Sequence, residues 1–345
     1  MKGLWKHLTP FAPDQSGAVS VLYEMGGLLV ICDAGGCAGN VCGFDEPCWF
    51  TQRSAVFSAG LRDMDAILGR DDRLVEKLAL AAEKLDARFA AIIGTPVPAV
   101  IGTDFSALRR MAEKRTGLPV LTVDSTGMGL YDAGAEKAYL ALFARFAAEP
   151  CPVERGRIGV LGCTPLDLGS TDAAALTAVL RARGWTRVDC YGMGAGLDAV
   201  CTAAANERNL VVAPSGLAAA EHLQARFGTP YEICDPLAET LLPERYDYAG
   251  RTALVVHAQV RANALRAALE RRGVRVQTAT WFAQKPALMR PADIRLTGEE
   301  QFTALLCGGF DLLVGDAALR SAAPGFSGDV IDVPHFALSG RLARR

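Results

Sequence analysis

The chain has 345 residues, of which 50% are hydrophobic and 21% are charged, and its formal net charge is −2. This composition allows large buried cores and excludes a disordered chain, and the balanced charge argues against a nucleic-acid-binding protein, which needs a basic face. Residues 1–17 lack the apolar segment of a signal peptide, and no apolar run reaches the ~18 residues that a membrane span requires. We therefore expect a cytoplasmic protein in which the ten cysteines are reduced thiols or metal ligands, not disulfides.

The first part of the chain predicts short buried strands that alternate with amphipathic helices. We expect a first helix over residues 16–25, with Ser16 as its N-cap and Gly26 and Gly27 as its stop. The later apolar runs and helical periods predict strands over 28–31, 54–58, 89–94 and 118–123, and helices over 71–85, 104–116 and 135–148.

The same alternation occurs twice more, after two polar, proline-containing breaks at 150–156 and 243–250. Strands are predicted over 157–161, 187–191, 210–212, 230–233, 252–256, 274–278, 311–314 and 330–333, and helices over 170–183 and 261–272. The expected fold class is therefore α/β, with three Rossmann-like units whose parallel sheets are flanked by helices. The breaks place these units at residues 1–150, 151–248 and 249–345.

Four of the ten cysteines lie within one glycine-rich segment that follows the first strand. They are Cys32, Cys37, Cys42 and Cys48, and Gly36 and Gly39 are among the glycines between them. Thiolates are the ligands of iron–sulfur clusters, and glycine lets the backbone approach a bulky group closely. The spacing C-x4-C-x4-C-x5-C is not that of a zinc site, so a structural or redox-active thiol loop is the alternative.

Ligands of parallel sheets bind beyond the carboxyl ends of the strands. The residues expected at those ends are Cys32, Thr95, Asp124, Cys163, Gly192, Ser215, His257, Asp316 and His335. His335 could ligate a metal or contact a substrate, although a hydrogen-bonded structural histidine is the commoner case. No Ser–His–Asp arrangement follows from the spacing, so catalytic residues stay unassigned.

Several segments in this order resemble those of a known family. The segment Gly36-Cys37-Ala38-Gly39 looks like a cluster-binding loop, and further similar segments are 92–104, 213–216, 252–264 and 333–340. Their order and spacing over three units resemble the nitrogenase component 1 family, which includes nitrogenase catalytic subunits, cofactor-assembly scaffolds and the reductases of tetrapyrrole synthesis. In size the chain is similar to the compact homodimeric members.

The resemblance implies a homodimer with an iron–sulfur cluster, of the [4Fe–4S] type, at the subunit interface. It also implies electron delivery by a separate ATP-hydrolysing iron protein, and the chain itself has no G-x-x-x-x-G-K-[ST] loop for a triphosphate. The expected function is an iron–sulfur reductase subunit that acts on a small molecule or a tetrapyrrole. The alternatives are a scaffold or carrier for metallocluster assembly, and a small-molecule-binding protein whose cysteines carry no metal.

The resemblance is incomplete at the expected cluster. Thr95 stands where the family usually has a further cluster cysteine, and only Cys37 matches a family ligand position securely. Cys48, Cys42 and, last, Cys32 are the replacement ligands to consider, and Gly36 and Gly39 are expected to line the cofactor. A symmetric dimer could supply two thiolates from each chain to one cluster.

Overall fold

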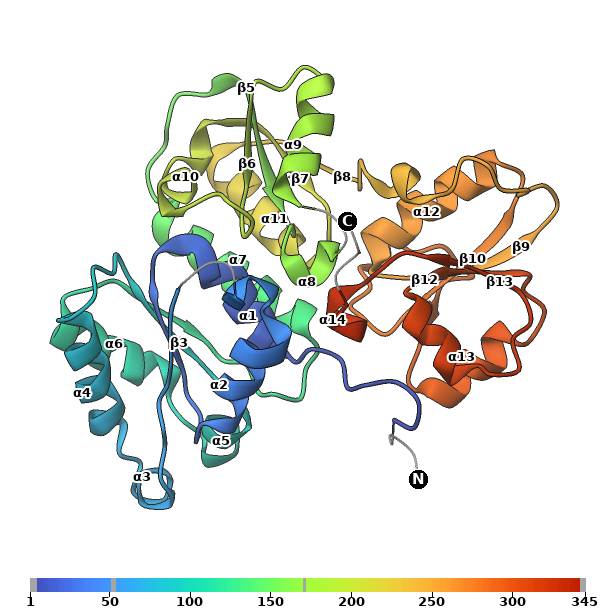
Figure 1. Ribbon diagram of the computed structural model, residues 1–345. Coiled ribbons are helices and arrows are strands. Elements are labelled where there is room, and N and C mark those ends of the chain that lie inside the picture. Colours follow the sequence, from blue (N-terminus) through green and yellow to red (C-terminus); the bar gives the residue numbers. More distant parts are fainter. Residues whose placement is uncertain (1–4, 51–53, 170–171, 342–345) are drawn as a thin grey trace.

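The computed structural model describes residues 5–50, 54–169 and 172–341. The chain forms three lobes, each built around one parallel sheet (Figure 1). The strand orders are β2-β1-β3-β4, then β6-β5-β7-β8, then β11-β10-β9-β12-β13. This arrangement confirms the predicted α/β class with three helix-flanked parallel sheets.

The first sheet is covered by helices on both faces because its strands are apolar on both sides. Its strands are β1 (Leu28–Ile31), β2 (Ala55–Ser58), β3 (Ala90–Ile93) and β4 (Val120–Val123). Its helices are α1 (Asp14–Leu22), α3 (Asp63–Leu68), α4 (Asp71–Ala82), α5 (Pro96–Ile101), α6 (Phe105–Thr116) and α7 (Tyr131–Phe146). Successive strand residues point to opposite faces, so Leu29 and Ile31 pack with α1 and α7 while Leu28 and Val30 pack with α4 and α6.

The first helix begins earlier than its sequence predicts. α1 starts at Asp14 with Pro13 as its N-cap, so the prediction of Ser16 as N-cap is wrong. The Ser16 hydroxyl instead donates to the Asp45 carboxylate at 2.7 Å, because this end of α1 packs on the cysteine segment. The predicted stop is confirmed, since the short helix η1 (Tyr23–Met25) ends at Gly26, whose φ of 74° suits glycine.

The second sheet repeats this plan with shifted boundaries. Its elements are β5 (Glu154–Leu161), β6 (Arg187–Cys190), β7 (Asn206–Val211), β8 (Tyr231–Ile233), α8 (Pro165–Leu168), α9 (Ala173–Ala182), α10 (Leu197–Cys201), η4 (Ala203–Ala205), η5 (Pro214–Gly216) and α11 (Leu217–Phe227). β5 begins inside the break predicted at 150–156, and the sequence pattern missed α11. The start predicted for α9, at residues 170–171, lies outside the described residues.

The third sheet has five strands. Its elements are β9 (Thr252–Val256), β10 (Arg275–Thr280), β11 (Ile294–Arg295), β12 (Leu312–Gly315), β13 (Asp329–Asp332), η6 (Ala238–Leu241), α12 (Gln259–Arg271), η7 (Pro286–Leu288), α13 (Glu299–Leu306), η8 (Ala317–Ala322) and α14 (Phe336–Ser339). The edge strand β11 and helix α13 were not predicted, since neither carries a clear apolar period.

The three units pack against one another, and the N-terminal segment of the first unit crosses to the third. The N-terminal residues 5–12 cross to the third sheet (Figure 1), where the Glu299 carboxylate accepts the backbone N–H groups of residues 6–8 and Trp5 and Phe11 pack near Trp281. α7 packs on α11, and α8 packs on α14. The division at 150 and 248 stays a prediction. Among the described residues, no helix is long and apolar enough to cross a membrane.

Candidate functional site

The cysteine segment is helical, so its prediction as a loop is wrong. After β1 the chain forms α2 (Gly36–Asn40), a π-helical turn η2 (Val41–Asp45) and a 3-10 turn η3 (Pro47–Phe50). Gly35 enters α2 with a φ of 121°, which glycine adopts without strain. The Asp33 carboxylate accepts the backbone N–H of Ala38 at 2.8 Å, which satisfies a donor in the first turn.

Asp33 fixes this helix to the sheet. Its carboxylate is buried, and its second oxygen accepts the hydroxyl of Ser58, at the end of β2, at 2.6 Å. One side chain therefore connects β1, β2 and α2. The position of Cys37, at the second residue of α2, is set by this connection and by the turn at Gly35.

Cys37 lies at the carboxyl ends of β1 and β3. Its thiol is partly exposed and lies beside Thr95, which is the N-cap residue of α5. The Thr95 hydroxyl also donates to the carbonyl oxygen of Cys32 at 2.8 Å. Burial raises the pKa of the Cys37 thiol and the negative charge of Asp33 adds to the rise, while the Thr95 hydrogen bond opposes it. A metal must therefore displace a proton from this thiol.

Cys32 occupies a different environment. Its side chain is buried in the core between the first sheet and α4, beside residues such as Leu74 and Leu78. Burial, with smaller contributions from Asp71 and Asp33, raises the pKa of this thiol to about 12. Cys32 therefore behaves as a packed hydrophobic residue in this structure.

Cys42 and Cys48 flank a buried carboxyl group. Burial raises the pKa of Glu46 to about 7, against hydrogen bonds from Cys48 and Ser20 that lower it. Burial and then Glu46 raise the pKa of Cys48 to about 12, and the same two causes raise that of Cys42. Both thiols are partly exposed, so they remain open to a ligand at the surface.

The donor set of one chain does not complete a metal site. In the described parts of the chain, no three His, Cys, Asp or Glu side chains come together in an arrangement that could hold a metal ion. Thiol chemistry suits iron and sulfide, and Cys37, Cys42 and Cys48 are partly exposed. Their donor chemistry and exposure are thus compatible with an iron–sulfur ligand role. Gly36 and Gly39 have open space where a Cβ would stand, so they leave room for close approach.

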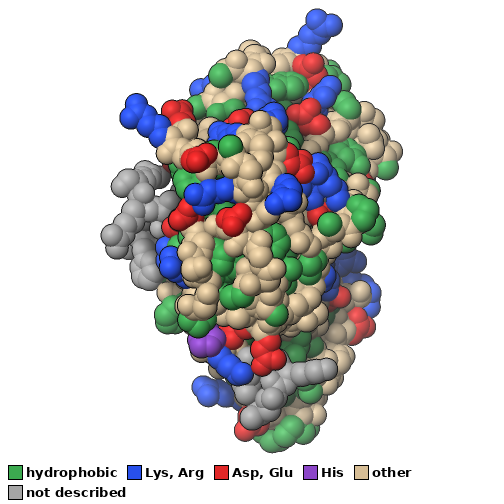
Figure 2. All heavy atoms as spheres, turned by 90° about the vertical axis from the view of Figure 1, so that its right-hand side faces the viewer, with side chains coloured by type: hydrophobic (Ala, Val, Ile, Leu, Met, Phe, Trp, Pro, Cys, Tyr) green, Lys and Arg blue, Asp and Glu red, His purple; other side chains and the backbone are tan. Residues whose placement is uncertain are grey.

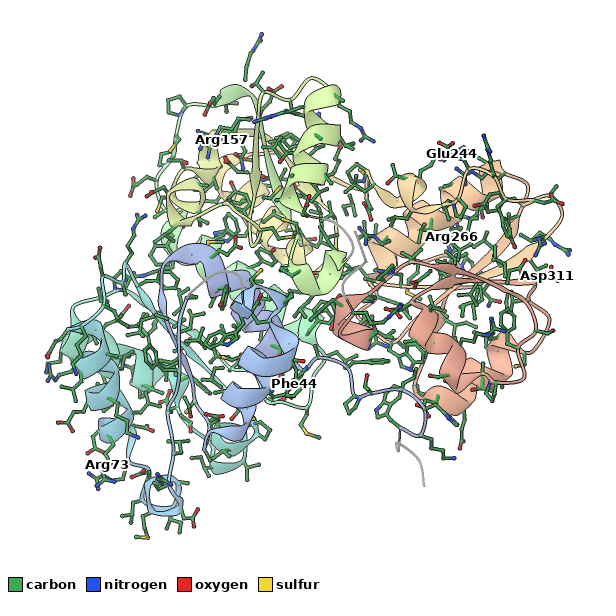
Figure 3. The ribbon with its side chains drawn as sticks, in the orientation of Figure 1. Phe44, Arg73, Arg157, Glu244, Arg266 and Asp311 are labelled. Atoms are coloured by element: carbon green, nitrogen blue, oxygen red, sulfur yellow. The ribbon has the colours of Figure 1, made fainter. Side chains whose placement is uncertain are left out.

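Exposed apolar side chains lie at the same end of the first unit as this segment. The α3–α5 face consists of two helices in contact whose exposed apolar residues are Met64, Ile67, Leu68, Val100 and Ile101. α5 starts directly after Thr95, and α2, α3 and α5 lie at the same end of the first unit (Figure 1). Phe44 projects from the cysteine segment and is 75% exposed (Figure 3). Apolar patches of this kind mark interaction surfaces.

A second polar cluster lies where the three units meet. The Tyr131 hydroxyl, at the start of α7, donates to the Asp167 carboxylate on α8 at 2.7 Å and lies 3.0 Å from Nε2 of His335, which follows β13. The Thr164 hydroxyl donates to the other Asp167 oxygen at 2.8 Å. All four side chains are buried. Since the tyrosine hydroxyl donates to Asp167, Nε2 of His335 is the donor to the tyrosine oxygen and Nδ1 is left as an acceptor, which has no partner within the described part of the chain.

Burial moves the pKa values of this cluster in opposite directions. It raises the pKa of Asp167 to about 7, even though hydrogen bonds from Tyr131 and Thr164 lower it. It lowers the pKa of His335 to about 3, and the nearby Arg261 adds to that shift. Asp167 is therefore poised to exchange a proton near neutral pH, and His335 stays neutral.

Arg261 is the buried cation of the same junction. Its guanidinium, on α12, pairs with the Asp235 carboxylate after β8 at 2.5 Å, and its Nη2 has no partner among the residues that the structure describes. The ring of His257, which follows β9, stacks on that of His335 with centroids 4.3 Å apart. Burial lowers the pKa of His257 well below its usual range. The junction thus combines an acid, two neutral imidazoles and a cation.

The strand-end argument identified part of this junction. His257, His335 and Cys163 were expected at strand ends, and β9, β13 and β5 do end just before them. Tyr131, Asp167 and Arg261 were missed, although the sequence Thr164-Pro165-Leu166-Asp167 is typical of a helix N-terminus. No sequence signal placed Tyr131 beside them, because the three residues come from different units.

Two solved structures resemble this chain closely in fold. One is described as "Nitrogenase Cp1 at pH 6.5", with a TM-score of 0.74 and 11% identity over 96% of this chain and 87% of that chain. The other is described as "Nitrogenase Cp1 at pH 5", with a TM-score of 0.63 and 18% identity over 98% of this chain and 78% of that chain. At these identities the likeness shows the fold. No curated protein matches the sequence.

The sequence itself matches a family over more than half of its length. The family is described as "Nitrogenase component 1 type Oxidoreductase", and the match covers residues 16–240. This range includes the cysteine segment, Thr95, Tyr131 and Asp167. The chain therefore belongs to the nitrogenase component 1 type oxidoreductase family.

Proposed function

We propose that this protein is the substrate-reducing subunit of a two-component reductase. It receives low-potential electrons from a separate ATP-hydrolysing iron protein and reduces a small molecule or a tetrapyrrole at the junction of its three units. Two copies of the chain meet at the cysteine segment and hold one iron–sulfur cluster, of the [4Fe–4S] type, between them. The observation that carries this proposal is the partly exposed Cys37 thiol beside Thr95, in the family-matched region and among exposed apolar side chains.

The thiols divide into ligands and structural residues under this proposal. Cys37 is the first ligand, and Cys48 or Cys42 from the same chain is the second. Two such pairs, one from each copy, complete four thiolates. Cys32 faces the core between the sheet and α4, so it serves the fold. When bound, the cluster supplies single electrons at low potential.

The junction supplies protons in the same proposal. Reduction of an organic double bond needs protons as well as electrons. Tyr131 joins His335 to Asp167 in one chain of hydrogen bonds, and Asp167 is the member of this chain that exchanges protons near neutral pH. The pKa of Asp167, raised to about 7 by burial, suits this role at neutral pH. Arg261 lies close enough to lower the pKa of His335 and would attract an anionic substrate group.

The test is purification of the full-length chain without oxygen, followed by cluster reconstitution with iron and sulfide. We expect bound iron and sulfide in equal amounts, an EPR signal on reduction, and a dimer by sedimentation. Cys307→Ala is a matched control, because Cys307 is exposed in the third unit. A colourless, iron-free protein after reconstitution would refute the proposal.

A cluster carrier is the second candidate, and the residue at position 95 favours it. Thr95 provides a hydroxyl where the family usually has a further cluster cysteine. Each chain therefore has one thiolate fewer with which to bind the cluster. A less tightly held cluster suits transfer to another protein. Incubation with an apo-ferredoxin acceptor separates the two functions: a carrier loses its iron to the acceptor, whereas the reductase keeps its iron and turns over with the iron protein.

A further inference from the structure

Two cysteines of the second unit form a pair outside the cysteine segment. Cys163 follows β5 and Cys190 ends β6, and these two strands are neighbours in the sheet. Gly162, with a φ of 78°, turns the chain so that the Cys163 thiol folds back, and this thiol donates to the carbonyl oxygens of Val160 and Tyr191 at 3.2 Å each. The side chains of Cys163 and Cys190 also pack in the same core cluster of the second unit, close enough for a hydrogen bond between the two sulfur atoms.

Only one member of the pair is open to reagents. Cys163 has no exposed surface, whereas Cys190, 3% exposed, lines a pocket of about 370 Å³ between α9 and β6. Thr177 and Arg181 of α9 line the same pocket. A small reagent in this pocket therefore meets Cys190 first and finds Cys163 behind it.

The two thiols differ in charge state as well as in access. Burial raises the pKa of Cys163 well above its usual range. The hydrogen bond from Cys163, helped by one from Thr177, lowers the pKa of Cys190 despite its burial. Cys190 is thus the more acidic member of the pair, and the thiolate is the form that reacts with electrophiles.

We propose that Cys190 and Cys163 form a peroxide-sensitive dithiol, in which Cys190 is the reacting thiol and Cys163 the resolving thiol. The Cys190 sulfur attacks one oxygen of hydrogen peroxide, the O–O bond breaks, and sulfenic acid and hydroxide form. The Cys163 sulfur then attacks the sulfenic sulfur, the S–O bond breaks, and the hydroxyl leaves with the Cys163 proton as water. Two thiols and one peroxide give one disulfide and two waters.

The surrounding hydrogen bonds tolerate the disulfide. The Val160 carbonyl keeps the backbone N–H of Tyr191 at 3.0 Å after the Cys163 proton is lost. The Tyr191 carbonyl keeps the hydroxyl of Tyr139 at 2.6 Å. Neither buried acceptor is left without a donor, so oxidation does not incur the cost of an unpaired buried group.

The test treats the reduced, chelator-washed full-length chain with a small excess of hydrogen peroxide. After alkylation and digestion without reductant, mass spectrometry should find Cys163 linked to Cys190. Cys201 lies in the same tryptic fragment as Cys190, so Cys201→Ser is the matched control and should keep the link. Cys190→Ser should abolish it. In Cys163→Ser, the sulfenic acid at Cys190 should persist and react with dimedone.

The competing outcomes are equally visible. We expect Cys190 to be oxidised about tenfold faster than the exposed Cys307, because its pocket admits a molecule as small as hydrogen peroxide and its pKa is lowered by its neighbours. Oxidation of Cys307 or Cys201 first, with Cys163 and Cys190 still free after unfolding, would overturn the proposal. So would failure of dimedone to label Cys190 in Cys163→Ser, provided that this variant melts as the parent does. None of these results depends on an iron–sulfur cluster.

Discussion

The cysteine segment and the three-unit junction are built in opposite ways. At the junction, Tyr131, Asp167 and His335 come from three different units of one chain and are fully buried. In the cysteine segment, the ligand candidates Cys37, Cys42 and Cys48 come from one stretch of sequence and remain partly exposed. One chain thus completes a polar network at its centre, whereas its cysteine segment keeps thiols partly exposed. Under the proposed function, the junction forms when the chain folds and the cluster site forms when two chains associate.

The exposed faces of the first and third units also differ, one being apolar and the other charged. Figure 2 shows the side of the third unit, where Lys and Arg are mixed with Asp and Glu over the face. The α3–α5 face of the first unit instead carries exposed residues such as Ile67 and Val100, the latter 86% exposed. A mixed charged face suits water, whereas an apolar face suits a second protein surface. The following predictions test this difference, from the largest effect to the smallest.

Cys37→Ala should remove the capacity to bind iron after reconstitution almost completely, because it deletes the thiol at the carboxyl ends of β1 and β3. Cys32→Ala should bind as much iron as the parent, since its thiol faces the core. The measurement is iron and sulfide per chain after desalting. Equal iron in Cys37→Ala and the parent would remove Cys37 from the site.

Arg261→Met should lower the free energy of unfolding by about 3–5 kcal/mol, because it leaves the buried Asp235 carboxylate without its cation. Arg251→Met is the matched control in the same unit. Its partner Asp329 is exposed, so the change should cost about 1 kcal/mol or less. Denaturant unfolding of both variants measures the difference. Equal costs would show that the junction is open to water.

Val100→Asp should weaken self-association by about 2 kcal/mol or more, roughly thirtyfold in the dissociation constant, because it places an unpaired charge in the proposed interface. Val153→Asp introduces the same charge at another exposed valine, just before β5, and should leave association unchanged. Sedimentation over a concentration series measures both. A dimer unaffected by Val100→Asp would move the interface elsewhere.

His335→Gln and Asp167→Asn should change the pH dependence of stability in opposite directions. The pKa of His335 falls to about 3 in the folded chain. Between about pH 6.5 and pH 3, this side chain is therefore protonated in the unfolded chain and neutral in the folded chain. The free energy of unfolding therefore decreases through His335 as the pH falls from about 6.5 to 3. The pKa of Asp167 rises to about 7, so between about 4 and 7 only the folded chain holds its proton, and its contribution is lost as pH rises.

The two variants can be compared directly with the parent by unfolding at several pH values. Between pH 4 and 6.5, the stability of the parent relative to His335→Gln should fall by up to about 1.4 kcal/mol for each unit of acidification. Relative to Asp167→Asn it should rise by up to the same amount. If the free energy of unfolding depended on pH in the same way for all three proteins, burial would not shift the pKa of His335 or of Asp167.

The sequence alone determined most of the architecture. Short apolar runs fixed β1, β3, β9 and their neighbours, because a strand buried on both faces needs apolar side chains at every position. Gly26 marked the end of the first helix, since glycine adopts the positive φ of a helix end at little cost, unlike other residues. These signals depend only on neighbouring residues, so they can be recognised without knowledge of the fold.

The tertiary structure alone decided which side chains meet. The cysteine segment reads as a loop because its glycines weaken the helical pattern, and only the contact from Asp33 to Ala38 and the packing on α1 make it a helix. The pairing of Cys163 with Cys190 and the meeting of Tyr131 with His335 join residues far apart in sequence. Such contacts depend on how whole units pack, and no local period or spacing encodes them.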